Sequence, residues 1–300
     1  MNKKWLSFEE QAQKLIDRKL CVENKQDLID FLKKKNYYYI SGYLFGFRIA
    51  NGEEYEDKSE KDGILQFKKI KSIMQLDELL RVIFTYPIEI IERDFKTKLA
   101  YYSSQPEDCN NQNLRETQPL WYTDKNNFQN PDAFSRFDAI LKKEKSSKKS
   151  LPFVKHYKEK YNDRMPIWVA VEILTFGTIL TLFKNMPVKK RRKISNDYGC
   201  SLYQLESWIP AIIDFRNLLA HDYRLYQHKV IKTPKQKDGC VMSTHKIFDY
   251  LLVCRHLIRD KALWNGFVIG NINKFMNKYN KISFNEGYGF PDNWQNYLIV

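Results

Sequence analysis

Apolar residues recur at three- and four-residue spacing along most of this chain, which is the pattern of amphipathic helices. The first example follows a capping box at Ser7 and Glu10, after which Phe8, Ala12 and Leu15 share one helical face. Glycine and proline, which interrupt helices, are scarce, with 11 and 10 among 300 residues. We therefore predict an all-α fold, with helices that start near Ser7 and Asn24 and others at about 67–102, 131–144, 152–161, 166–185, 187–196, 201–222, 244–264 and 266–278.

No internal repeat of fixed period is present, and we expect one compact helical unit over residues 1–300. Within it, residues 1–63 form an N-terminal helical region, about 64–265 form the helical core, and 266–300 form a C-terminal extension. Polar stretches at 50–63 and 103–120 predict loops, and the one at 230–243 predicts a short hairpin or a loop.

Two of the apolar stretches carry a further expectation. Pro87 falls inside the long stripe at 67–102, and we expect a break or kink there because proline removes a backbone donor and clashes with the preceding turn. The stretch 166–183 approaches the length of a membrane span. Glu172 near its middle makes a membrane location costly, so we predict a helix buried in the protein core.

An aromatic segment at 36–48, NYYYISGYLFGFR, has two interpretations. Its rings could form a platform on which nucleic-acid bases stack. They could instead form a packed core between helices, where Tyr and Phe dominate the energetics. We favour the core interpretation.

The positive charge of the chain bears on what the protein binds. The formal net charge is +14, and the segment 141–193 holds fifteen basic and four acidic residues, a net +11. A regional excess of this kind indicates a surface that binds phosphate groups, although a solvated face with a mobile basic linker at 142–150 is the plainer alternative. The candidate RNA-binding residues are Lys142, Lys143, Lys148, Lys149, Lys189, Lys190, Arg191, Arg192 and Lys193.

The cysteines and the N-terminal residues indicate in which cellular compartment we expect the protein. Five cysteines are scattered without a CxxC pair, which argues against a zinc site and for reduced, unpaired thiols. Glu9 and Glu10 precede any apolar stretch, unlike a signal peptide. We expect a cytoplasmic protein that needs no metal.

The candidate chemistry lies in the segment from Arg216 to His221, RNLLAH. Asn217 and His221 are four residues apart, so they project from one helical face. Arg216 is five residues from His221 and points roughly 140° away on an ideal helix, at about 100° per residue. Arg216 and His221 can therefore act on one phosphate only if the helix loosens near His221 or if a second copy supplies the missing group, as in a homodimer that pairs two such helices.

These residue types suit cleavage of RNA. Histidine can exchange a proton with the ribose 2′-hydroxyl or the leaving oxygen near neutral pH, arginine can bind the phosphate, and asparagine can orient either group. Because the 2′-hydroxyl is an internal nucleophile, no metal or other cofactor is required, and DNA should be spared. An arginine and a histidine at this spacing are also common on ordinary helices, so the spacing alone is weak.

The chain resembles the AbiD/AbiF abortive-infection family of bacterial phage-defence proteins. The resemblance runs from about residue 5 to 228 and rests on segments in order: FEEQAQKLIDRKL (8–20), NYYYISGYLFGFR (36–48), ERDFKTKLAYYSS (92–104), LPFVKHYKEKY (151–161), MPIWVAVEILTFGTILTLFKNM (165–186) and ESWIPAIIDFRNLLAHDYRLYQ (206–227). It implies the helical bundle of the HEPN superfamily, with a HEPN-like core at about 64–265. It also implies a metal-independent ribonuclease site built from two motifs, to which Arg216, Asn217 and His221 correspond. Toxicity on infection, and control by a small structured noncoding RNA, are further implications. Asp222 stands where many relatives have a second histidine, which puts any role of that position in doubt.

Three functions remain open at this point. The first is an endoribonuclease with RNA as substrate. The second is a non-catalytic module that holds a structured RNA, with the motif helix serving assembly. A peripheral membrane effector is the weakest of the three, because no helix pairs the basic stretch with a clear apolar face.

Overall fold

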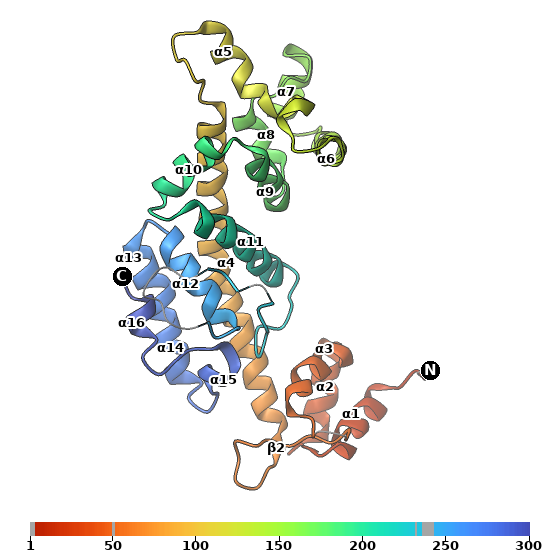
Figure 1. The fold of residues 1–300 in the computed structure, drawn as a ribbon. Helices are drawn as coiled ribbons and strands as arrows, with labels where there is room; N and C mark the ends of the chain where they lie inside the picture. Colours follow the sequence, from red (N-terminus) through yellow and green to blue (C-terminus); the bar gives the residue numbers. More distant parts are fainter. Residues whose placement is uncertain (1–3, 50–51, 232, 236–242) are drawn as a thin grey trace.

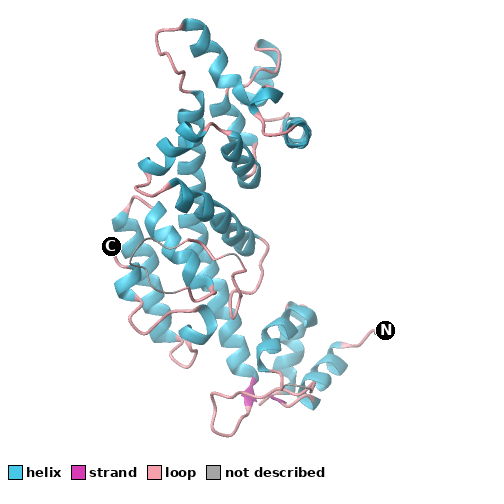
Figure 2. Cartoon of the chain, in the orientation of Figure 1, coloured by secondary structure: helices cyan, strands magenta, loops and turns pink. Residues whose placement is uncertain are grey.

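The fold comes from a computed structural model that describes residues 4–49, 52–231, 233–235 and 243–300. Residues 236–242, in the stretch predicted as a hairpin or loop, lie outside the described residues. The predicted all-α class is confirmed, since helices dominate the chain (Figures 1 and 2). Two short parallel strands, β1 (Leu20–Cys21) and β2 (Leu65–Gln66), pair with each other and connect the N-terminal helices to the start of the longest described helix.

The helices, in chain order, are α1 (Phe8–Asp17), α2 (Lys25–Lys34), α3 (Tyr37–Leu44), α4 (Phe67–Ser104), α5 (Gln112–Thr117), α6 (Pro131–Ser147), α7 (Pro152–Lys160), α8 (Ile167–Ile173), α9 (Phe176–Asn185), α10 (Val188–Asp197), α11 (Leu202–Ala220), α12 (Ile247–Leu257), α13 (Lys261–Leu263), α14 (Gly270–Lys278), α15 (Phe284–Tyr288) and α16 (Gln295–Leu298). The 3-10 turns are η1 (Phe45–Phe47), η2 (Gln118–Thr123) and η3 (Lys125–Asn127), and a π-helical turn, η4 (Trp264–Ile269), joins α13 to α14.

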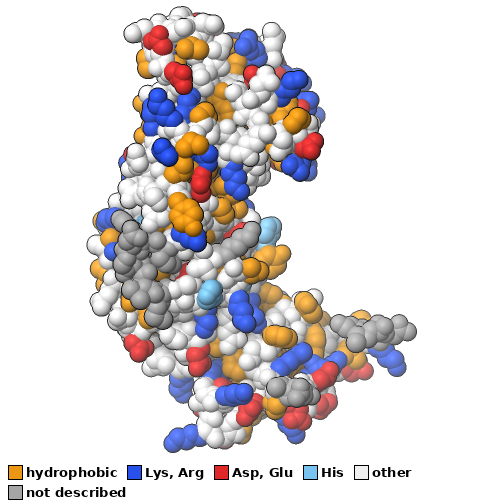
Figure 3. All heavy atoms as spheres, in the orientation of Figure 1, with side chains coloured by type: hydrophobic (Ala, Val, Ile, Leu, Met, Phe, Trp, Pro, Cys, Tyr) orange, Lys and Arg blue, Asp and Glu red, His pale blue; other side chains and the backbone are white. Residues whose placement is uncertain are grey.

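Helix α4 is the spine of the molecule (Figure 1). Its 38 residues extend roughly 57 Å at 1.5 Å per residue. Helices α1–α3, the N-terminal lobe, lie beside its first turns, α5–α9 lie at its far end, and α10–α16 pack along its middle. The molecule is therefore elongated, and one side is hollowed between the N-terminal lobe and the α6–α9 group (Figures 1 and 3).

The break expected at Pro87 is absent, and α4 continues through it. The missing amide costs one hydrogen bond of the helix. Packing on both sides offsets that loss: Phe84 contacts Phe215 of α11 with ring centroids 5.7 Å apart, and Tyr86 contacts Phe267 of η4 at 5.8 Å. Tertiary contacts therefore keep the helix continuous through a residue that would interrupt it in isolation.

The single helix predicted at 166–185 is wrong, because it is divided into α8 and α9. Leu174 has an extended backbone, and the hydroxyl of Thr175 then caps α9 by accepting from the amide of Thr178 at 3.3 Å. Threonine is a good N-cap residue, so a new helix starts there. The expected burial is confirmed, since both helices line the core with residues such as Ile173 and Ile179. Among the described helices, none is both long and apolar enough to cross a lipid bilayer.

Three further boundaries differ from the prediction. The second half of the loop predicted at 103–120 is helical, because α5 and the start of η2 occupy it, and η2 buries Trp121 and Tyr122. The basic stretch at 142–150 is not a free linker, because α6 continues to Ser147. The predicted helix at 244–264 ends at Leu257, and Asp260 caps a new helical run that continues from α13 to α14.

Candidate functional site

The candidate residues Arg216, Asn217 and His221 lie at the C-terminal end of α11. This helix starts at a capping box between Ser201 and Gln204. Its apolar face is buried against α4, α9, α10 and α12, which explains why α11 is held in one orientation. Arg216, Asn217 and His221 are all exposed, so the structure places every candidate of the motif at the surface. In Figure 1, the last turn of α11 is directed toward the hollowed side of the molecule.

The helix ends at the histidine itself. Ala220 is the last helical residue, and His221 caps α11 with its amide donating to the carbonyl of Asn217 at 3.0 Å. Asp222 then adopts a left-handed backbone with φ of 55°. The loosening near His221, one of the two arrangements that the motif spacing left open, is therefore present.

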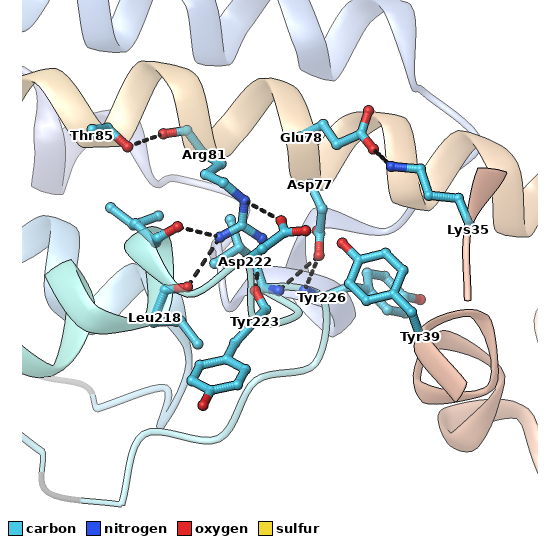
Figure 4. Close-up of polar contacts among 12 residues, drawn as sticks. Lys35, Tyr39, Asp77, Glu78, Arg81, Thr85, Leu218, Asp222, Tyr223 and Tyr226 are labelled. Carbon is cyan, nitrogen blue, oxygen red and sulfur yellow. Dashed lines mark hydrogen bonds and ion pairs between the residues drawn. The ribbon is translucent and has the colours of Figure 1, made fainter. Parts of the chain in front are cut away.

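Arg81 of α4 holds this helix end in place (Figure 4). Its guanidinium donates to the carbonyls of Leu218 at 3.1 Å, Leu219 at 2.9 Å and Tyr223 at 2.8 Å. The same group forms an ion pair with Asp222, Nε to Oδ1 at 3.0 Å. The planar guanidinium of Arg81 thus donates hydrogen bonds to carbonyls that a helix end leaves unpaired. These bonds hold the backbone in place on both sides of His221.

The side chains of Arg216 and His221 have different neighbours. The Nε of Arg216 lies 3.7 Å from a carboxylate oxygen of Glu92 on α4. The ring of His221 lies against that of Tyr223, with centroids 5.9 Å apart. Within one chain, the side chain of Arg216 therefore lies near α4, whereas that of His221 contacts the segment that follows the motif.

A shallow depression of about 300 Å³ adjoins the motif. Apart from Asn217, its lining residues were not among the candidates predicted from the sequence. The depression is lined by Asp214, Asn217, Leu218, Tyr223, His228, Lys229, Ile231 and Tyr250. Burial, and secondarily the charge of Arg224, lower the pKa of His228 below its ordinary 6.5, so this imidazole is neutral at pH 7. Tyr223 and His228 follow the motif by a few residues, and that proximity was the one signal that could have found them.

A buried carboxylate anchors the segment after the motif. Asp77 of α4 is fully buried and accepts from the amides of Leu225 at 2.7 Å and Tyr226 at 3.1 Å. It also accepts from the hydroxyls of Tyr43 at 2.9 Å and Tyr288 at 2.7 Å. Four separate parts of the chain therefore meet at Asp77, and Figure 4 shows its contacts with the segment that follows the motif.

The nine basic candidates fall into three groups, according to whether the fold engages them and whether they stay exposed. Some are committed to the fold: Lys148 pairs with Glu144 at 2.9 Å, Lys190 is half-buried and donates to the carbonyl of Ser103 at 2.8 Å, and Arg191 forms an ion pair with Glu206. Lys142 pairs with Asp138 at 2.7 Å but stays exposed, and Lys193 donates to Gln105 at 2.8 Å. The exposed side chains that have neither an ion pair nor a side-chain hydrogen bond among the described residues are Lys143, Lys149, Lys189 and Arg192.

The fold and the site define an all-α protein that presents an Arg-Asn…His motif at the exposed end of a well-packed helix. The chain belongs to the Abi-like protein family, whose family model matches residues 30–227. The match covers α4 and all of α11, and it confirms the resemblance to an abortive-infection family. Membership supports a role in bacterial abortive infection. No curated protein and no solved structure matches the chain significantly.

Proposed function

We propose that this protein is an RNA-directed effector of abortive infection whose α11 motif cleaves RNA. The observation that carries the proposal is the exposure of Arg216, Asn217 and His221 at a helix end that Arg81 holds in place. A catalytic histidine needs a fixed backbone and an open approach for the substrate, and this helix end offers both.

The reaction follows from the residue types. The ribose 2′-oxygen attacks the adjacent phosphorus, and the bond between phosphorus and the 5′-oxygen breaks. His221 takes the proton of the 2′-hydroxyl or returns one to the leaving 5′-oxygen. Arg216 binds the phosphate and offsets the charge that develops on it, while Asn217 orients either partner. The expected products are a 2′,3′-cyclic phosphate and a 5′-hydroxyl.

Assembly of the site requires a second copy in this proposal. Because Arg216 is drawn to Glu92 and His221 to Tyr223, a single chain does not direct both at one phosphate. A homodimer that brings two α11 ends together would offer the arginine of one copy and the histidine of the other. This is the arrangement that the HEPN resemblance implies.

The reaction chemistry predicts the substrate. With EDTA present, we expect the purified protein to cleave an all-ribose oligonucleotide and to leave the matching all-deoxy oligonucleotide intact, because the deoxy strand lacks the internal nucleophile. The products are resolved by gel and by mass spectrometry of the cyclic phosphate. Equal cleavage of both strands, or loss of RNA cleavage in EDTA, would contradict the mechanism.

The exposed basic side chains favour a second candidate, a module that holds a structured RNA without cleaving it. Purification of the protein with a discrete RNA, but without cleavage activity, would favour this candidate. Both candidates need phosphate contacts from the 141–193 region.

We expect the substitution of Lys143, Lys149, Lys189 and Arg192 by glutamine to weaken RNA binding and to flatten its salt dependence. Each phosphate contact contributes roughly 0.7–0.9 to the slope of log K against log salt, so the loss should approach 3 if all four make contact. The matched control removes four exposed cations elsewhere, at Lys58, Lys61, Arg115 and Lys125. Binding would be measured by filter retention across a salt series. An equal loss in both variants would show that net charge, and not this surface, governs binding.

A further inference from the structure

The aromatic segment at 36–48 is only partly core. Ile40, Tyr43 and Leu44 are buried as the core interpretation expects, and Tyr43 donates to Asp77. Tyr38, in contrast, is 80% exposed, and Trp5, just before α1, is 85% exposed. These are the two most exposed aromatic side chains in the described chain. Leaving large rings in water forgoes burial energy, so such a pair indicates a surface that something covers.

Both rings line one depression of the N-terminal lobe, of about 730 Å³. Four cations share its lining with a single acid: Lys4, Lys14, Arg18 and Arg48 against Glu53. Arg18 forms an ion pair with Glu53, while Arg48 packs over the ring of Phe45, 5.6 Å from its centroid. The depression therefore combines exposed aromatic faces with a net positive charge.

The rings are presented by well-held backbone. The segment that carries Trp5 is fastened to α1 by the Ser7–Glu10 capping box and by Gln11, whose side chain donates to the carbonyl of Leu6 at 2.8 Å. Tyr38 lies in the first turn of α3, and its amide donates to the capping side chain of Asn36 at 2.7 Å. A preordered platform loses little conformational entropy when a ligand binds.

The depression borders the candidate site through α3. Arg224 donates to the carbonyl of Gly42 on α3, and a side chain at Gly46, in the following turn η1, would collide with Gln227. Lys35, just before α3, pairs with Glu78 of α4 at 2.5 Å. The lobe is thus docked on the segment that follows His221.

We propose that this depression binds single-stranded RNA, with bases stacked on Trp5 and Tyr38 and phosphates on Lys14 and Arg48. The inference rests on the proposed function, in which RNA is the partner, and it names the strand state and a contact site away from the motif. Stacking needs unpaired bases, whereas duplex RNA hides their faces. A protein partner fits less well, because lysine, which supplies two of the four cations, is depleted at the centres of protein interfaces.

The test uses the full-length His221→Ala protein, so that RNA stays intact, and a labelled, unstructured oligouridylate of about 12 nucleotides, within the range that such sites cover. Fluorescence anisotropy gives the affinity. We expect the Trp5→Ala, Tyr38→Ala pair to weaken binding roughly 30-fold or more, because two base-stacking contacts are lost. The Trp5→Phe, Tyr38→Phe pair should retain most of the affinity, because it keeps the rings.

The matched control is Tyr101→Ala with Tyr203→Ala, which removes two aromatic side chains that are 64% and 63% exposed elsewhere. It should bind like the parent, and a duplex of the same length should be bound alike by all variants. Unchanged oligouridylate binding by the Trp5, Tyr38 pair, or no binding by the parent, would overturn the proposed site. Failure of the wild-type protein to cleave RNA would count against the nuclease alone, since this test measures binding without cleavage.

Discussion

Replacing His221 with alanine is expected to reduce RNA cleavage by about 10²- to 10⁴-fold, the usual contribution of a general acid or base. The reason is chemical: the imidazole is the group of the motif that can move a proton near neutral pH. The rate of cleavage of a defined RNA, measured under single-turnover conditions, gives the effect directly.

The arrangement of the helix end makes this test clean. Arg81 contacts the carbonyls of Leu218, Leu219 and Tyr223, and His221 adds its own backbone amide, so the imidazole is not part of the clamp. Its removal should leave the end of α11 in place and RNA binding intact. His156→Ala is the matched control, since His156 is also exposed but lies on α7. Wild-type cleavage by the His221 variant would remove this residue from the mechanism.

The second large effect concerns stability. We expect Asp77→Ala to lower the free energy of unfolding by about 4 kcal/mol, because it leaves two amides and two tyrosine hydroxyls without their buried acceptor. Urea denaturation followed by circular dichroism measures the change. Asp17→Ala, at an exposed carboxylate of α1, should cost about 0.5 kcal/mol or less. A loss under about 1 kcal/mol for the Asp77 variant would contradict the account.

The effect of Asp77 should also depend on pH. Burial raises the pKa of its carboxyl above the ordinary 3.8, against the four donors, which lower it. The folded chain therefore holds this proton more tightly than the unfolded chain does. The stability that protonation of Asp77 contributes is complete below pH 3.8 and declines as the pH rises toward the folded pKa. The difference in the free energy of unfolding between wild type and Asp77→Ala should therefore become smaller as the pH rises from 3.8 through the folded pKa of Asp77.

Much of the fold was predictable because helices depend on local pattern. The caps at Ser7 and Asn24 and the apolar stripes place most helices within a few residues of their observed bounds. The predicted helix bounds were wrong where tertiary packing overrode a local signal or where a local capping signal was overlooked. Pro87 does not interrupt α4 because packing on two sides offsets one lost hydrogen bond, and Thr175 starts a helix that the continuous apolar stretch concealed.

The candidate site divides in the same way. The residues Arg216, Asn217 and His221 came from the sequence, and the ideal-helix angle between Arg216 and His221 already required a loosened end or a second copy. The residues that hold the site in place, Arg81 and Asp77, could not be predicted from the sequence. Arg81 lies 137 residues from Leu218 and Asp77 lies 148 residues from Leu225 along the chain. Neither residue has a local signature that distinguishes it on the face of α4.

The sequence by itself thus determined the helical class, the family, the regional charge and the identity of the motif, because each depends on residue type and short-range spacing. Only the tertiary structure decided where α11 ends, which groups hold that end, which of the basic side chains are free to meet a phosphate, and which rings of the aromatic segment remain exposed. The physical reason is that these properties depend on contacts between residues far apart in the chain, which form only when α4 brings the N-terminal lobe and the motif helix together.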